Sequence, residues 1–403
     1  MKTKNLIKPA IALIVLMIAF TACKKDENAT PTPAPTGDLP TVVTQKVFCS
    51  SINSALCKGT VMEDGGSTVT EIGFCWSTSQ NPTIADSHIA IDTEIYPFSG
   101  DLTGLTANTT YYVKAYATNG VGTGYGEELS FKTLKPAQTG ALSGVFSAGE
   151  NKHIYFAQGN LQYQASTNTW RFADTQFDII GGNNSHISIS YDGWIDLFCW
   201  ATSGYPHGST CYQPWSTYAS YGNNAYNAYG AYTYNLNDST GMADWAYNPI
   251  SNGGNQENIW HTPTDYEWNY VLQQRETPSG ILFVMAQVGG MNGMILFPDT
   301  WDADLYELDY INLNNYPNFD VNVISSSDWT DIFEANGAVF LAAAGAREGS
   351  TVDAVGTFGG YWSSTHNVPV SSYGVSFNDH LMIGFNSLIR WGGYCVRLAC
   401  DAD

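Results

Sequence analysis

Residues 41–134 consist of short strand-like segments separated by turns, and this pattern restricts the region to β structure. Gly, Asn and Pro interrupt the segments at short intervals, as in two-sheet sandwiches. The clearest segment is 111–117, where side chains alternate between two faces. One face holds Tyr111, Val113 and Ala115, and the other holds Tyr112, Lys114 and Tyr116. The region is therefore predicted to be an all-β sandwich.

Two motifs in this region resemble the fibronectin type III domain. The segment Leu-Thr-Ala-Asn-Thr-Thr-Tyr at 105–111 matches that family's approach to the strand with its corner tyrosine, which implies this role for Tyr111. Gly-Phe-Cys-Trp-Ser-Thr at 73–78, followed by Asn-Pro-Thr at 81–83, is typical of the Bacteroidetes variant. The resemblance covers 41–134 and implies a spacer or stalk module without a catalytic constellation.

The first 22 residues have the make-up of a secretory signal peptide. Three lysines precede an apolar run at 10–20 that is short for a membrane span, and small residues follow it. The cysteine placed directly after them makes the segment resemble a bacterial lipoprotein signal, which implies cleavage before Cys23 and lipidation of Cys23. The Lys-Lys-Asp-Glu at 24–27 resembles the surface-export tag of Bacteroidetes lipoproteins. The alternative is a cleaved signal and a free secreted protein.

The chain divides into five parts on this basis. The signal peptide spans 1–22, and the lipidated cysteine with a proline-rich, semi-rigid spacer spans 23–40. The fibronectin type III-like domain spans 41–134, a linker spans 135–141, and the larger domain spans 142–403. The resemblances predict an outer-membrane protein that is lipid-anchored and exposed at the cell surface.

The charge balance excludes one class of partner. The 403 residues include 37 acidic and 16 basic side chains, for a formal net charge of −21. A chain this acidic repels polyanions, so a nucleic acid is not expected to bind it.

The eight cysteines leave seven besides Cys23, and an exported chain lies where disulfides form. An odd remainder predicts at least one free thiol or an intermolecular pair. Cys57 and Cys75 lie in neighbouring strand-like segments and are the predicted disulfide. The sequence does not pair the remaining cysteines, which are Cys49, Cys199, Cys211, Cys395 and Cys400.

The larger domain contains a helix signal and strand signals. Thr264 and Glu267 stand three residues apart, as in a capping box, and begin an amphipathic helix that runs to 274. Glu267 is thus interpreted as a cap partner. Three strands are predicted at 359–365, 372–377 and 389–398, with turns at 366–371 and 378–388. Trp362 and Val396 are predicted to lie in the core.

Three motifs recur in order along this domain: Thr-Pro-Thr-x-x-Glu-Trp at 262–268, Gly-Tyr-Trp-Ser-Ser-Thr at 360–365 and Arg-x-Gly-Gly-Tyr-Cys-Val-Arg-Leu at 390–398. The set resembles Bacteroidetes and Fibrobacter surface lipoproteins with a C-type-lectin-like domain (the Fibrobacter major paralogous domain). Formylglycine-generating enzymes and the variable proteins of diversity-generating retroelements share that fold. The resemblance implies an α+β C-type-lectin-like domain after the all-β fibronectin type III-like sandwich, so the chain is multidomain.

In the variable proteins, exposed residues between the fixed strands of the last segment contact ligand. The resemblance carries this role to His366, Asn367, Tyr373, Asn378, Asp379, His380, Asn386 and Trp391. Polar and aromatic side chains of this kind suit recognition. The calcium-site signatures of lectins, Glu-Pro-Asn or Gln-Pro-Asp followed by Trp-Asn-Asp, are absent from the sequence. Neither a metal site nor a cofactor is expected.

Three features leave alternatives open. The acidic stretch 299–309 is either a solvated face or a set of oxygen ligands for calcium. The tyrosine-rich stretch 205–247 is either a loop packed on its own domain or a recognition surface. Cys395 and Cys400 are five residues apart, as in the copper-binding cysteine pair of formylglycine-generating enzymes.

The sequence thus predicts a surface-anchored adhesion protein without catalytic activity. Its larger domain, 142–403, which we call the head, is predicted to bind an extracellular glycan or protein. The alternatives are a structural component of a surface assembly and, with less support, a copper enzyme of the formylglycine-generating type.

Overall fold

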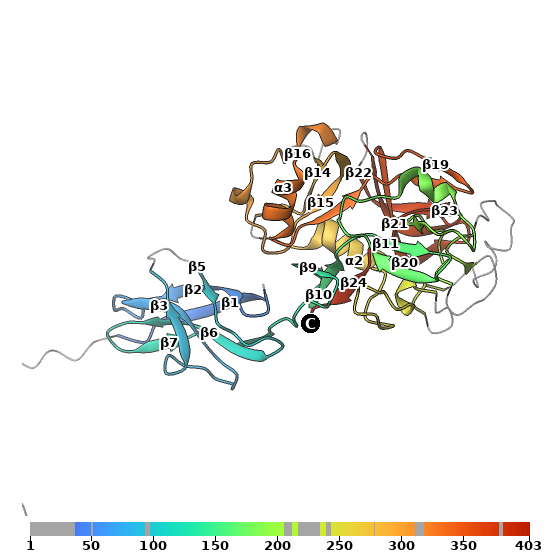
Figure 1. Ribbon diagram of the computed structural model, residues 1–403. Helices are drawn as coiled ribbons and strands as arrows, with labels where there is room; N and C mark the ends of the chain where they lie inside the picture. The colour runs from blue at the N-terminus through green and yellow to red at the C-terminus, as the bar shows by residue number, and fades with distance from the viewer. Residues whose placement is uncertain are drawn as a thin grey trace, which may run out of the picture.

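The computed structural model describes residues 37–49, 51–92, 97–204, 212–216, 234–238, 243–277, 279–310, 318–378 and 382–403. The predicted signal peptide, Cys23, most of the spacer, Cys211, Asp379 and His380 lie outside them, as do large parts of the tyrosine-rich stretch. In Figure 1 a smaller β unit is joined by a short connection to a larger unit of strands and short helices. No helix in the described ranges is long and apolar enough to cross a membrane.

The smaller unit is a sandwich of two antiparallel sheets. One sheet has the order β1–β2–β5, and the other has the order β4–β3–β6–β7, with β8 also pairing with β6. The strands are β1 (Thr41–Cys49), β2 (Ala55–Glu63), β3 (Glu71–Ser77), β4 (Ser87–Ala90), β5 (Phe98–Leu102), β6 (Thr110–Thr118), β7 (Thr123–Tyr125) and β8 (Leu129–Lys132). The predicted all-β sandwich is confirmed.

Period-two alternation in β6 places side chains as predicted. Tyr111, Val113 and Ala115 enter the core between the sheets, where the ring centroid of Phe74 lies 5.1 Å from that of Phe98. The hydroxyl of Tyr111 accepts a hydrogen bond from the backbone N–H of Thr106 at 3.0 Å. A tyrosine that fixes the chain upstream of its own strand is the corner of such sandwiches. The strand order and this corner make the unit fibronectin type III-like.

The larger unit is built from several small sheets. Its strands are β9 (Ala141–Gly149), β10 (Lys152–Ala157), β11 (Leu161–Gln164), β12 (Thr169–Phe172), β13 (Trp194–Ile195), β14 (Phe283–Val288), β15 (Met291–Leu296), β16 (Val323–Ile324), β17 (Val339–Ala342), β18 (Ala346–Glu348), β19 (Thr351–Asp353), β20 (Phe358–Val368), β21 (Ser371–Asn378), β22 (Met382–Ile389), β23 (Gly392–Gly393) and β24 (Ala399–Asp401). They form the sheets β9–β10–β24, β12–β11–β13, β16–β14–β15–β17, β19–β18–β23 and β20–β21–β22. Both ends of the unit therefore meet at β10.

The helices of this unit are short. They are η1 (Gly181–Ser185), η3 (Trp245–Tyr247), α2 (Asp265–Asn269), η5 (Ala303–Leu305), η7 (Phe319–Val321) and α3 (Ser326–Asp328). The π-helical turns η4 (Tyr270–Gln274) and η8 (Trp329–Glu334) extend α2 and α3. The capping box before α2 is confirmed, because the Thr264 side chain accepts from the Glu267 N–H while the Glu267 side chain accepts from the Thr264 N–H.

One strand prediction is wrong. The sequence predicts a turn at 378–388, whereas residues 382–389 form the strand β22, which pairs with β21. The expected third strand at 389–398 instead leaves this sheet, pairs briefly with β18 and forms single bridges with Phe198 and Tyr361. Val396 and Leu398 are fully buried there. A buried segment without regular strand pairing is as apolar as a buried strand. The amino-acid composition of 389–398 therefore does not show whether the segment pairs in the sheet.

The two units are joined by specific hydrogen bonds. Lys135 donates its backbone N–H to Ala402 O at 2.8 Å, and the Tyr155 hydroxyl donates to Lys135 O at 2.8 Å. Leu134 is fully buried in the core of the larger unit. The start of the linker and the residue before it are thereby fixed to the larger unit beside β10 and β24.

Candidate functional site

The three recurring motifs of the larger unit pack against one another. Trp268 donates its indole N–H to Trp362 O at 3.3 Å, and Trp362 donates its backbone N–H to Cys395 O at 3.0 Å. The Trp362 indole N–H also donates to Phe198 O at 2.7 Å. Trp268, Trp362 and Val396 are fully buried, which confirms the core prediction for the last two. The three motifs therefore form part of the core of the larger unit.

The predicted ligand-contact residues lie around the sheet β20–β21–β22 but do not share one face. Asn367 donates to the Ser387 hydroxyl, whereas Asn386 donates to the Ser376 hydroxyl at 2.6 Å. Ser387 and Asn386 are consecutive in β22, so their side chains point to opposite faces. The Nδ1 of His366 lies 3.2 Å from the side-chain oxygen of Asn235. Three further members are half-buried: Tyr373, Asn378 and Trp391. Ligand contact by this set stays a prediction.

Cys57 and Cys75 are both free thiols, so the predicted disulfide is corrected. Cys57 lies on β2 and faces the core of the sandwich. Cys75 lies on β3 of the other sheet, between the core-facing Phe74 and Trp76, so alternation turns it to the outer face. Its thiol donates to Lys114 O at 3.7 Å. A disulfide needs side chains that approach each other, and these two point apart.

Cys395 and Cys400 lie in separate hydrophobic clusters of the larger unit. Both are buried free thiols, and burial raises the pKa of Cys400 to about 12 and that of Cys395 well above its usual range. The described residues contain no group of three or more His, Cys, Asp or Glu suited to a metal ion.

The acidic stretch 299–309 serves two structural purposes. Asp299 accepts from the Arg275 guanidinium at 2.8 Å and from the N–H and hydroxyl of Ser147. Asp302 accepts from the Asp304 N–H at the start of η5, and the remaining carboxylates are exposed. This arrangement matches the solvated acidic face rather than a ligand set converging on one ion.

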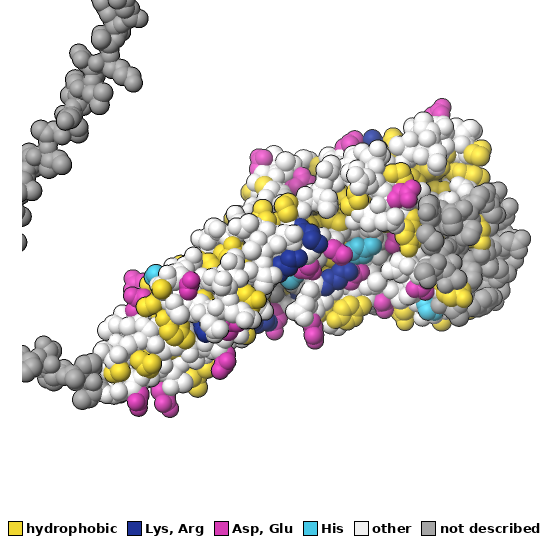
Figure 2. Space-filling model, turned by 90° about the horizontal axis from the view of Figure 1, so that it is seen from below, with side chains coloured by type: hydrophobic (Ala, Val, Ile, Leu, Met, Phe, Trp, Pro, Cys, Tyr) yellow, Lys and Arg dark blue, Asp and Glu magenta, His cyan; other side chains and the backbone are white. Residues whose placement is uncertain are grey.

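A polar pocket lies where β10, β24 and the start of α2 meet. The amino-acid sequence does not predict it. The volume of the pocket is about 400 Å³. Lys152 of β10 contacts Glu267 of α2 at 2.7 Å and Asp401 of β24 at 3.3 Å. His261 contacts the same Glu267 carboxylate at 3.1 Å and pairs through its backbone with Ala399. Figure 2 shows Lys or Arg, Asp or Glu and His side chains gathered near the middle of this face. We call this feature the α2 pocket.

The carboxylate of Glu267 is the centre of the α2 pocket. Burial alone would raise its pKa, but hydrogen bonds and charge from His261, the Lys152 ammonium and the Thr264 N–H lower the pKa to about 2. The distance from Thr264 N to Glu267 Oε2 is 2.7 Å. A carboxylate this acidic and this fully bound is a poor proton acceptor at neutral pH. The group therefore holds three segments together and is not suited to general base catalysis.

Sequence reasoning assigned Glu267 only to the helix cap and missed Lys152, His261 and Asp401. These residues are separated by more than one hundred positions and belong to no shared motif. The capping box is the sequence pattern that points to this site, because it predicts that the Glu267 side chain folds back toward the Thr264 backbone.

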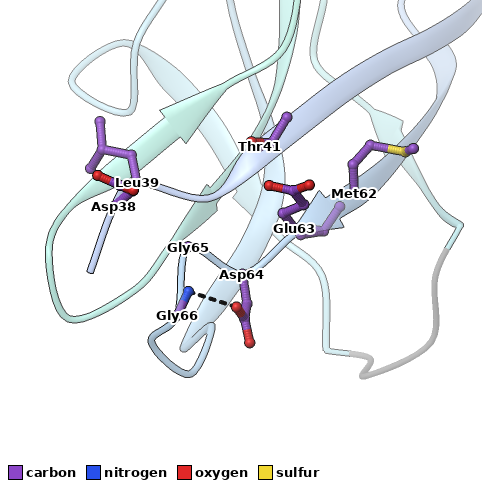
Figure 3. Close-up of a pocket in the computed structure, with 9 residues that line it drawn as sticks. Asp38, Leu39, Thr41, Met62, Glu63, Asp64, Gly65 and Gly66 are labelled. Atoms are coloured by element: carbon purple, nitrogen blue, oxygen red, sulfur yellow. Dashed lines mark hydrogen bonds between the residues drawn. The ribbon is translucent and has the colours of Figure 1, made fainter. Parts of the chain in front are cut away.

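A second, wider pocket lies at one end of the sandwich (Figure 3). Asp38, Glu63 and Asp64 line it beside the turn that contains Gly65 and Gly66, and Gly66 N–H donates to the Asp64 carboxylate at 2.8 Å. Its carboxylates come from Asp38 before β1, from the last residue of β2 and from the turn that follows β2. The pocket is therefore negatively charged, but its side chains are not arranged around a common ligand position.

The solved structures described below each match about a quarter of the chain. No protein-family model matches it, and no curated protein matches it. Among solved structures, the short sensor domain of the anti-sigma factor RsgI4 from Pseudobacteroides cellulosolvens is 22% identical, with 24% of this chain and 97% of that chain covered and a TM-score of 0.19. The sixth fibronectin type III domain of human fibronectin type III domain containing protein 3 is 24% identical, with 26% and 92% covered and a TM-score of 0.19. The third fibronectin III domain of the human KIAA0343 protein is 17% identical, with 27% and 94% covered and a TM-score of 0.20.

Proposed function

We propose that this chain is a lipid-anchored surface protein whose fibronectin type III-like stalk presents a C-type-lectin-like recognition head. The lipoprotein-type segment ending at Cys23 and the Lys-Lys-Asp-Glu after it support an outer-membrane anchor with outward display. The interlocked motifs and the meeting of β9 and β24 on β10 support the lectin-like head.

One observation carries the proposal of recognition over bond chemistry. The buried charged side chains that the structure describes in the head are held by hydrogen bonds to neighbouring groups. Asp244 accepts from Thr262 and from the Ala246 N–H, and Arg347 donates to Leu197 O and Gly349 O. Reactive groups need a pKa near the working pH and room for a substrate. These groups have structural partners instead, so the exposed polar and aromatic side chains remain for ligand contact.

The ligand is an extracellular glycan or a protein of a host or neighbouring cell. Contact would come from aromatic anchors and adaptable polar groups. The resemblance to the Fibrobacter-type and variable proteins supports contact at residues such as Tyr373 and Trp391. Replacing either by Ala is then expected to abolish binding without unfolding, and retained affinity would remove them from the site.

The deciding experiment is binding of the full chain in detergent to a mixed array of glycans and surface proteins, with calcium or with chelator. Chelator-insensitive binding to a defined ligand is the expected result. Calcium-dependent binding would contradict the expectation that no metal takes part. If the protein binds to no spot on the array, the proposed recognition function is wrong. The alternative of a structural component of a larger surface assembly would then be favoured.

A further inference from the structure

We propose that the α2 pocket binds a neutral saccharide. The inference rests on the proposed recognition function and assigns it a site different from the predicted residues on β20–β22. It stands on three features of the pocket: a fixed floor, an uncommitted rim and a compensated charge. A volume of about 400 Å³ lies within the range of roughly 300–1,000 Å³ that is usual for small-ligand sites.

The floor of the α2 pocket is fixed before any ligand arrives. Glu267 is 3% exposed and accepts from Lys152, His261 and Thr264. Trp260 is buried and donates its indole N–H to Gly253 O at 2.8 Å. Groups that are already held in place lose little freedom on binding, which favours affinity in a small site.

Side chains at the rim of the α2 pocket remain able to contact a ligand. Tyr266 is 53% exposed and presents its ring beside the pocket. The side-chain amides of Asn237 and Asn258 make no hydrogen bond to any described part of the chain. Their backbones are nevertheless anchored, because Asn258 N–H donates to Ala246 O at 3.2 Å and Asn237 O accepts from the Tyr247 hydroxyl at 3.3 Å. Positioned amides with free donors and acceptors match vicinal hydroxyl groups, which also donate and accept.

The charge of the α2 pocket selects against anions. Lys152 already contacts two carboxylates, at 2.7 Å and 3.3 Å, so its charge is compensated. A phosphate, sulfate or uronate would meet Glu267 and Asp401 without a free cation. An exposed tyrosine ring suits the C–H face of a sugar, while amides and a carboxylate suit its hydroxyls. A neutral saccharide satisfies all of these groups at once.

The test is saturation-transfer NMR on the full chain in detergent with glucose, galactose, mannose, N-acetylglucosamine and their short oligosaccharides, and with galacturonate as the anionic comparison. At least one neutral sugar is expected to bind and galacturonate is not. Tyr266→Ala is expected to weaken that binding about fivefold or more, since the ring contact is lost. Tyr266→Phe keeps the ring and should retain binding. Circular dichroism of each variant shows whether it is folded.

Tyr112→Ala is the matched control, since it removes a half-buried tyrosine of the sandwich that belongs to neither candidate site. Binding that survives Tyr112→Ala but not Tyr266→Ala supports the α2 pocket. Binding that survives Tyr266→Ala but is lost in Tyr373→Ala would overturn the pocket while leaving recognition by the head intact. Failure of every neutral sugar, or binding of galacturonate in their place, would also overturn it, and protein spots on the array would still test the proposed function separately.

Discussion

Glu267 is a single side chain that serves a helix cap, a closing sheet and a pocket floor. Its two oxygens accept from His261 and Thr264, which precede the helix, and from Lys152 of β10. A buried carboxylate with this many donors stabilises the fold only while it carries its charge.

Replacement of Glu267 by Gln removes that charge at nearly constant volume. We expect Glu267→Gln to lower the free energy of unfolding at pH 7 by about 2–3 kcal/mol, measured by urea denaturation. Glu276→Gln is the matched control, because the Glu276 side chain is 77% exposed and pairs only with an exposed Lys46. It should leave the midpoint unchanged, and equal effects of the two changes would contradict the role given to Glu267.

The same carboxylate predicts a pH dependence. Its pKa is about 2 in the folded chain, against an ordinary value of 4.5. Between these values the unfolded chain binds the proton and the folded chain does not, so acid favours unfolding. The stability difference between wild type and Glu267→Gln should be full above pH 4.5 and shrink as the pH falls toward 2. A difference that stays constant over this range, in denaturation measured at each pH, would refute the assignment.

The cysteines of the sandwich give a direct chemical prediction. Burial raises the pKa of Cys57 to about 12, with a contribution from Asp101, and raises that of Cys75 to about 11. Native chain without reductant should therefore leave both thiols unmodified by iodoacetamide, and denatured chain should show both alkylated by mass spectrometry. If the pair were a disulfide, neither would react after denaturation until a reductant was added.

At the scale of elements, the corner tyrosine of β6 ties a strand to the loop before it. Tyr111→Phe removes the hydroxyl that accepts from Thr106 N–H, and we expect a loss of about 1 kcal/mol in unfolding free energy of the sandwich. Tyr112→Phe on the same strand is the control, as its side chain is half-buried on the opposite face. Calorimetry of the full chain should show a lower transition temperature for the first variant and not for the second.

How far the sequence predicts each element depends on how local its determinants are. The faces of β6 follow from alternation, and the start of α2 follows from Thr264 and Glu267, because each rests on residues within one strand or one turn. β22 and the departure of 392–398 from the sheet depend on which distant strand each segment meets. The α2 pocket is unpredictable for the same reason, since Lys152, His261 and Asp401 come together only after β24 has paired with β10.

At the scale of the whole molecule, anchoring is the prediction that most affects function. Cys23→Ser should prevent lipid attachment, so the protein should move from the membrane fraction to the soluble one when exported. Detergent phase partition followed by blotting measures this. Protease added to intact cells should degrade the wild-type head, and a head protected on intact cells but not on lysed ones would contradict outward display.

The junction between the two units determines how a mechanical load would travel. If the N-terminus is anchored, tension would enter the larger unit at β9 and be shared with the residue after β24 through the hydrogen bond from Lys135 to Ala402. A ligand held in the α2 pocket would pull on α2 and, through the contacts of Lys152 with Glu267 and Asp401, on the strands next to that junction. The load path between ligand and stalk would then run through the β9–β10–β24 sheet and the start of α2 beside it, and drag on a bound particle would strain these segments first.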